Sequence, residues 1–294
     1  MQDAPPPLTE PQITRRHVVN WRMPRPRLAV GRHAQRVPHQ ARVWLLISLP
    51  VLFFLTAPVV AILLRVSPAG LLENLNNRTV VQAISLSLTT TAITLVISMV
   101  AGTPVAYLLA RYRFRGRMVL DTLIDLPMVL PPSVAGIALL VAFGRRGLFG
   151  SYLTDAGIEL AFTQAAVVLA QTFVAAPFYI KAAIAGFAGV ERDLEQAAQI
   201  DGAGAWQVFR YITLPLAATS LIGGAVMTWA RALGEFGATI IFAGNFPGRT
   251  QTMPLAIYLG FELDLNIALT LSVLLVGTSF AVLFVVKRVL RRHL

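Results

Sequence analysis

Residues 195–215, EQAAQIDGAGAWQVFRYITLP, form a mostly polar segment between two long apolar stretches of the chain. The residues that define its pattern are small or apolar: Ala197, Ala198, Gly202, Ile212, Leu214 and Pro215. A chain that keeps so organised a polar segment between apolar stretches is presenting it to a partner. The alternative is an ordinary amphipathic helix lying at an interface.

The local structure of this segment follows from its residue types. We expect a helix over 194–200, a turn at 202–204 and a second short helix over 205–213. Glycine permits the backbone geometry of a tight turn. Trp206 and Phe209, three residues apart, share one side of the second helix. Leu214-Pro215 disfavours continuation of that helix, because a residue before proline avoids the α region.

The composition is that of a polytopic membrane protein. Hydrophobic residues make up 56% of the chain and charged residues 13%, with a mean hydropathy of +0.67. Soluble domains carry about 25% charged residues. The absence of cysteine excludes disulfides, thiolate metal sites and cysteine nucleophiles. The four histidines lie near the termini, so zinc sites and Ser-His-Asp triads lack their residues. We predict no catalytic or metal-binding residue.

Six apolar stretches reach the roughly 20 residues that a spanning helix needs. They are Val43–Leu64, Val80–Ala110, Met118–Phe143, Gln164–Phe187, Thr219–Ala243 and Ile267–Val286. We therefore predict an all-α membrane protein with six transmembrane helices. Three prolines, Pro127, Pro131 and Pro132, bend or interrupt the third stretch, because each removes a backbone donor.

The lysines and arginines predict the orientation. Nineteen lie on the side that holds both termini and residues 188–218, and five on the other side. Cytoplasmic loops carry the excess of positive charge, so we expect both termini to be cytoplasmic. Residues 1–42 form a basic, proline-rich and disordered tail, and 287–294 a second basic tail. The long tail can contact anionic membrane lipid. Its single aromatic residue, Trp21, argues against nucleic-acid binding.

The spacing in residues 195–215 resembles the EAA loop of binding-protein-dependent ABC transporter permeases, which docks on a separate ATPase subunit. The resemblance implies an ABC importer permease fold with a docking loop at 188–218. It assigns the docking role to Glu195, Gln196, Ala197, Ala198, Asp201, Gly202, Ala203, Trp206, Ile212, Leu214 and Pro215. The family usually has glutamate where this chain has Gln196, and the preceding Glu195 can compensate for it.

Two further segments resemble the molybdate permeases of this superfamily. They are LPMVLPPSVAGIALLVAFGRRGLF, residues 126–149, and ARALGEFGATIIFAGN, residues 230–245. Sulfate, thiosulfate and tungstate permeases share much of both patterns, and the FGRRG phrase at 143–147 favours molybdate. The resemblance covers a permease core at 80–286, and the first span at 43–65 is variable among relatives. Candidates for the translocation path are Thr90, Thr91, Pro131, Pro132, Arg231 and Glu235.

Several of these candidates have two readings. Arg231 and Glu235 lie four residues apart in the fifth stretch. They either form an ion pair that helps the helices to pack or lie beside the translocation path. Both alternatives fit the rule that ionisable residues in membranes usually face an interior or a cavity. Hydroxyls such as those of Thr90 and Thr91 either donate hydrogen bonds to an oxyanion in transit or take part in ordinary helix packing. Arg145 and Arg146 meet a solute-binding protein or an anion, or are solvated loop charges. Asp121 and Asp125 receive no role.

The chain has no P-loop, because neither of its two lysines, Lys181 and Lys287, follows a glycine. The resemblance therefore implies two copies of a cytoplasmic ATPase subunit that hold ATP and Mg, an extracytoplasmic solute-binding protein and a second copy of this chain. No cofactor is expected on this chain. Two other classes remain: a secondary transporter, which would need ionisable relays and an inverted repeat, and a membrane scaffold without transport.

Overall fold

The computed structural model describes residues 39–293. The predicted basic tail at 1–42 lies outside the described residues except for its last four, which belong to helix α1, His39–Arg65. The chain divides into two compact units, residues 1–52 and 53–294. The second unit contains every helix from α2 onward.

Helices account for all the regular structure of residues 39–293, so the all-α prediction is confirmed. After α1 they are α2 (Pro68–Leu75), α3 (Arg78–Arg111), α4 (Arg117–Val129), α5 (Pro132–Phe143), α6 (Gly150–Asp155), α7 (Gln164–Ala188), α8 (Arg192–Ile200), α9 (Ala205–Val208), the π-helix η1 (Phe209–Thr213), α10 (Leu214–Leu233), α11 (Gly237–Phe242), α12 (Met253–Leu263) and α13 (Leu265–His293). The predicted basic tail at 287–294 is thus helical as far as His293.

Five helical segments of the described chain are long and apolar enough to cross a membrane, or six if α4 and α5 count as one bent span. These two helices meet at an angle of 117°. Leu130 and Pro131 between them have extended backbone, and prolines in this segment cannot donate the hydrogen bonds that a straight helix needs. The predicted count of six therefore requires the proline-broken third span.

The predicted fifth span, Thr219–Ala243, is wrong at both ends. One helical segment runs from Ala205 through Pro215 to Leu233, and α11 is a separate short helix. Proline is tolerated here because η1 widens the helix just before it: Leu214 N–H donates to the Phe209 carbonyl, five residues back. The expectation that Leu214-Pro215 ends the helix is therefore also wrong.

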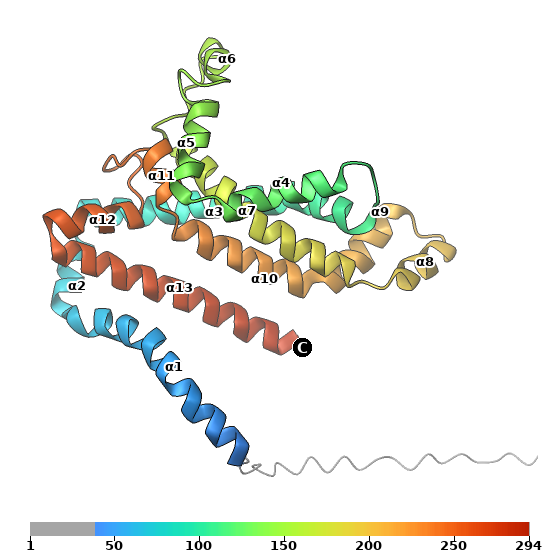
Figure 1. Ribbon diagram of the computed structural model, residues 1–294, viewed down its shortest axis with the longest axis horizontal. Coiled ribbons are helices and arrows are strands. Elements are labelled where there is room, and N and C mark those ends of the chain that lie inside the picture. Colours follow the sequence, from blue (N-terminus) through green and yellow to red (C-terminus); the bar gives the residue numbers. More distant parts are fainter. Residues whose placement is uncertain (1–38, 294) are drawn as a thin grey trace, which may run out of the picture. The chain divides into compact units, whose positions relative to one another are not determined.

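Helices α3, α7 and α10 pack side by side in Figure 1, and small residues let them approach closely. A Cβ atom on Gly224 of α10 would come within 2.6 Å of Ala182 Cβ on α7, and one on Gly186 within 2.6 Å of Ser220 Cβ. Helix α7 leads into the 188–218 loop, α10 leads out of it, and α3 ends beside it (Figure 1). The three packed helices thus meet the loop at one end of the bundle.

The candidate docking site at residues 188–218

The first arm of the loop is α8, which ends in a glycine turn. Gly202 has φ of +91°, the left-handed geometry that favours glycine. Gly202 N–H donates to the Gln199 carbonyl at 3.0 Å, and Ala203 N–H to the Ala198 carbonyl at 2.9 Å. These two bonds form a Schellman motif, which satisfies the last carbonyls of the helix. The turn predicted at 202–204 is confirmed.

The second arm joins the loop to the bundle through aromatic rings. Trp206 stacks on Phe209 with ring centroids 5.5 Å apart, so the predicted shared side of the helix is confirmed. Phe209 meets Tyr107 of α3 at 5.1 Å and Phe187 of α7 at 6.1 Å. A row of rings therefore runs from an exposed tryptophan, 71% accessible, to two packed helices.

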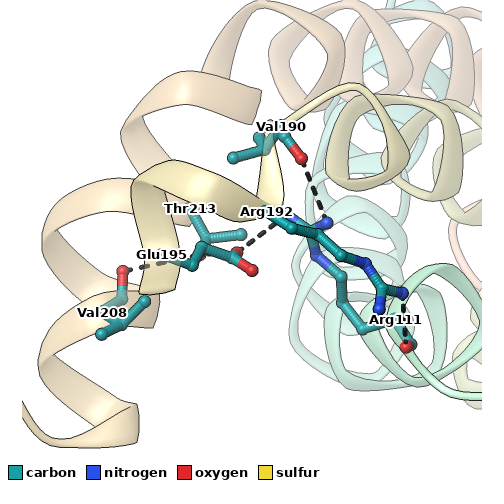
Figure 2. Close-up of polar contacts among 6 residues, drawn as sticks. All are labelled: Arg111, Val190, Arg192, Glu195, Val208 and Thr213. Atoms are coloured by element: carbon teal, nitrogen blue, oxygen red, sulfur yellow. Dashed lines mark hydrogen bonds and ion pairs between the residues drawn. The ribbon is translucent and has the colours of Figure 1, made fainter. Parts of the chain in front are cut away.

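A single carboxylate, that of Glu195, ties α8 to two other helices (Figure 2). Its Oε1 atom accepts hydrogen bonds from Arg111 Nη2 of α3 at 2.8 Å and from Thr213 Oγ1 of η1 at 2.5 Å. The side chains of Arg111 and Glu195 are only 7% and 14% exposed. Hydrogen bonds between charged groups are about twice as strong as neutral ones, so this pair is a firm attachment.

Backbone bonds reinforce the same attachment. Arg111 Nη1 donates to the Val190 carbonyl at 3.1 Å, and Arg192 Nη2 donates to the Arg111 carbonyl at 3.2 Å (Figure 2). A guanidinium near the end of a helix satisfies a free carbonyl and opposes the negative end of the helix dipole. The end of α3 and the start of the loop therefore hold each other.

The outer surface of the loop is unusually apolar for a polar segment. Ile200, Trp206 and Tyr211 are 86%, 71% and 72% exposed. Beside them lies an open groove of about 370 Å³, lined by Asp201, Gly202, Ala203, Gln207, Val208, Tyr211 and Ile212. Large exposed apolar side chains beside a groove suit insertion into another protein.

The structure brings most of the predicted docking residues together on this surface. Gln196 and Ala197 are exposed on α8, and Ala198 is half-buried beside the turn. Leu214 and Pro215 instead lie in the helix that continues into α10. Glu195 points inward, so its carboxylate is occupied by Arg111 and Thr213 and does not take over an outward contact from Gln196, contrary to expectation.

Arg231 and Glu235 form the predicted ion pair, with Arg231 Nη1 and Glu235 Oε2 2.6 Å apart. The pair spans the end of α10, which lies at Leu233. Glu235 is 1% exposed and its Oε1 also accepts from Ala238 N–H at 2.8 Å, so it caps α11. The packing role is therefore visible, and the role beside a path stays a prediction.

The other path candidates separate into two groups. Thr90 and Thr91 are 2% and 0% exposed, and Thr90 donates to the Leu86 carbonyl at 2.9 Å, which fits the packing reading. Pro131 and Pro132 are exposed at the bend between α4 and α5. A Cβ on Gly237 would lie 2.7 Å from Pro132 Cβ, so the bend packs closely on α11.

Sequence reasoning missed two ionic attachments. Lys181 Nζ of α7 lies 2.7 Å from Asp121 Oδ1 and 2.9 Å from Asp125 Oδ1 of α4. The sequence carried a signal for this ion pairing: two aspartates lie one helical turn apart, and a lone lysine lies in a neighbouring apolar stretch. Arg111 was counted only as a loop charge, and nothing in its local sequence indicated the Glu195 partner.

Away from the 188–218 loop, Arg145 forms an ion pair with Glu159, both well exposed. The pair borders a cavity of about 320 Å³ that Arg249 and Phe162 also line. Arg145 is therefore partly neutralised, whereas Arg146 has no ion-pair partner within residues 39–293. Contact of these arginines with a solute-binding protein or an anion stays a prediction.

Helices long and apolar enough to cross a membrane, with a polar loop at one end of the bundle, define a multi-pass membrane protein. The chain belongs to the family of binding-protein-dependent transport system inner membrane components, whose model matches residues 102–294. It is 45% identical over 223 residues to the molybdenum transport system permease protein ModB of Mycobacterium tuberculosis, covering 76% of this chain and 84% of that protein. It is 35% identical over 216 residues to the sulfate transport system permease protein CysW of Synechococcus elongatus, covering 73% and 76%.

The fold is that of solved importer permeases. A bacterial ABC transporter that imports the acidic polysaccharide alginate matches with a TM-score of 0.67 at 16% identity, covering 85% of this chain and 96% of that one. The same kind of transporter, in complex with an alginate-bound periplasmic protein, matches with a TM-score of 0.63 at 16% identity, covering 84% and 92%. The expected ABC importer permease fold is confirmed.

Proposed function

We propose that this chain is the membrane permease subunit of an ABC importer that carries molybdate into the cell. The observation that carries the proposal is 45% identity over 223 residues to a molybdenum transport permease, over a fold matched by ABC importers. Sulfate is the second candidate solute, because a sulfate permease is 35% identical over a similar length. ATP hydrolysis takes place on a separate subunit, which holds ATP and Mg.

The 188–218 loop is the docking element for that ATPase. Its exposed Ile200, Trp206 and Tyr211, the groove beside them and the rigid glycine turn support this role. The loop faces the cytoplasm, since the arginines of the segment joining α3 to α4 lie at the same end of the bundle and cytoplasmic loops carry the positive charge. Both termini are then cytoplasmic.

The permease works as a two-fold homodimer with two ATPase subunits and one extracytoplasmic binding protein. Cyclic pairing is the commonest symmetry of oligomers. The alginate importer whose permease shares this fold was solved with a periplasmic protein bound, which supports a partner of that kind on the far side of the membrane. Arg231, Glu235, Pro131 and Pro132 stay candidates for lining the path between the protomers.

Transport by the reconstituted importer tests the proposal. Proteoliposomes that contain this chain and its ATPase are supplied with binding protein outside and ATP inside, and uptake of labelled molybdate is measured. We expect uptake that depends on ATP and on the binding protein and that excess sulfate reduces little. Uptake of sulfate in preference to molybdate would reassign the solute. ATP-independent uptake would contradict an ABC importer, and the absence of any uptake would favour a scaffold.

A further inference from the structure

The position of Glu195 separates two roles on adjacent residues of α8. Neighbouring residues on a helix point about 100° apart, and here Gln196 is exposed while Glu195 is directed at α3 and η1. The outward residue is free to meet a partner, and the inward one is already bound. Gln196 is therefore placed to contact the ATPase, whereas Glu195, one residue earlier, attaches α8 to the bundle.

The connectivity of the chain shows why that attachment matters. Helices α7 and α10 are covalently joined to the loop and must follow it when it moves. The end of α3 is joined only by non-covalent contacts. Arg111, the last residue of α3, is 84 positions before Glu195, and Glu195 is its only carboxylate partner within residues 39–293.

The same carboxylate also reaches the entrance of α10. Thr213 is fully buried in η1, and its hydroxyl lies 2.5 Å from Glu195 Oε1 but 3.5 Å from the Val208 carbonyl. The shorter contact is the stronger hydrogen bond, so the hydroxyl donates to Glu195. One oxygen atom thus joins the end of α3, α8 and the helix that becomes α10.

We infer that Glu195 is a positioning residue for energy coupling: it fixes α8, the first arm of the 188–218 loop, to α3 and to η1, so that displacement of the loop by the ATPase moves all three packed helices together. This inference rests on the proposed docking function. Without this attachment the loop still meets the ATPase through its outer surface, but α3 no longer follows it with full amplitude. ATP is then hydrolysed with less solute moved.

The test is the number of molybdate ions imported per ATP hydrolysed by the complete importer. Glu195→Gln removes the ion pair and keeps the shape, and Thr213→Val removes only the hydroxyl donor. Glu262→Gln is the matched control, because Glu262 is an exposed carboxylate of α12 with no ion pair in the described chain. Co-purification of the ATPase with each variant measures docking separately.

We expect Glu195→Gln to retain the ATPase and to import about tenfold fewer ions per ATP, the effect of losing one charge-assisted hydrogen bond. Thr213→Val should lower the ratio less, about threefold, because it removes one hydrogen bond and keeps the Arg111–Glu195 ion pair, and Glu262→Gln should leave it unchanged. A merely structural role would reduce the amount of assembled importer at an unchanged ratio.

An unchanged ratio in Glu195→Gln importers overturns the inference. If that variant does not assemble, Thr213→Val decides, and a wild-type ratio there overturns it. Failure of the wild-type chain to bind the ATPase or to import any solute is a different result. It refutes the proposed function, and the inference with it.

Discussion

Gly202 lies in a turn whose left-handed backbone favours glycine, and Glu235 lies in the break between α10 and α11. Gly202 has a left-handed backbone, and an added Cβ would meet nothing within 4 Å, so the requirement for glycine is conformational and not steric. Glu235 follows the end of α10, where a 1% exposed carboxylate is balanced by Arg231 and by the Ala238 N–H in the first turn of α11. Both residues therefore act on the backbone geometry of a short segment.

Gly202→Val should weaken binding of the ATPase while the permease stays folded. A non-glycine residue in the left-handed region costs about 1 to 2 kcal/mol, so roughly tenfold fewer loops hold the docking geometry. The measurement is ATPase affinity for the purified permease, together with its unfolding temperature. Gly277→Val is the control, because Gly277 also has open space but lies within α13. Equal affinity in both variants would refute the docking role of the turn.

Arg231→Met should destabilise the protein more than Glu235→Gln. The arginine variant leaves a fully buried carboxylate without its cation, at a cost of about 3 to 5 kcal/mol. The glutamine variant retains an oxygen for Ala238 N–H, and Arg231, 29% exposed, keeps access to solvent. Thermal unfolding in detergent compares the two variants. The reverse order would show that the arginine, and not the carboxylate, is the buried charge that needs a partner.

Among the helices, α4 depends on its ion-paired neighbour, α7, more than α3, α7 or α10 depend on any one neighbouring helix. It is short, ends at the break in the third span, and exposes Met118 and Val129 to 80% each. Lys181 of α7 joins it at Asp121 and Asp125, at distances of 2.7 and 2.9 Å. Since α7 runs directly into the 188–218 loop, this attachment connects the loop to the bent span.

Lys181→Met should loosen α4 more than Asp121→Asn or Asp125→Asn does. Each partly exposed ion pair contributes only about 0 to 1 kcal/mol, but loss of the lysine removes both and leaves two like charges one turn apart. Hydrogen exchange of residues 117–129 measures the effect. Faster exchange in either aspartate variant than in the lysine variant would contradict it.

For the whole molecule, the proposed function assigns ATP hydrolysis to a separate subunit. Its sequence lacks the glycine-rich loop that cradles phosphates, and residues 39–293 contain no strand from which such a loop could lead. The family to which it belongs is named for a membrane component that works with a separate binding protein.

The purified chain should hydrolyse no ATP by itself. Hydrolysis should begin when its ATPase partner is added and should rise when the binding protein loaded with molybdate is present. A phosphate-release assay on the chain alone, the ATPase alone and the complex makes the comparison. ATP hydrolysis that stays with the isolated chain through purification would refute its role as the membrane subunit.

Local features of this protein followed from its sequence. The apolar stretches predicted five of the spans to within a few residues, and the glycine turn at Gly202 followed from residue type. Hydropathy and left-handed backbone geometry depend on a residue and its immediate neighbours. The spacing of 195–215 pointed to the family because the whole pattern lies within one continuous segment.

Only the tertiary structure decided which charges meet and where the fifth helix begins. Glu195 finds Arg111 across 84 positions, and Lys181 finds Asp121 across 60, because α3, α4 and α7 end or pass side by side. The helix continues through Pro215 because a π-turn and the Thr213–Glu195 bond hold the preceding backbone. Ion pairs and the contacts of buried hydroxyls depend on which helices pack together, and no single segment of the sequence determines that packing.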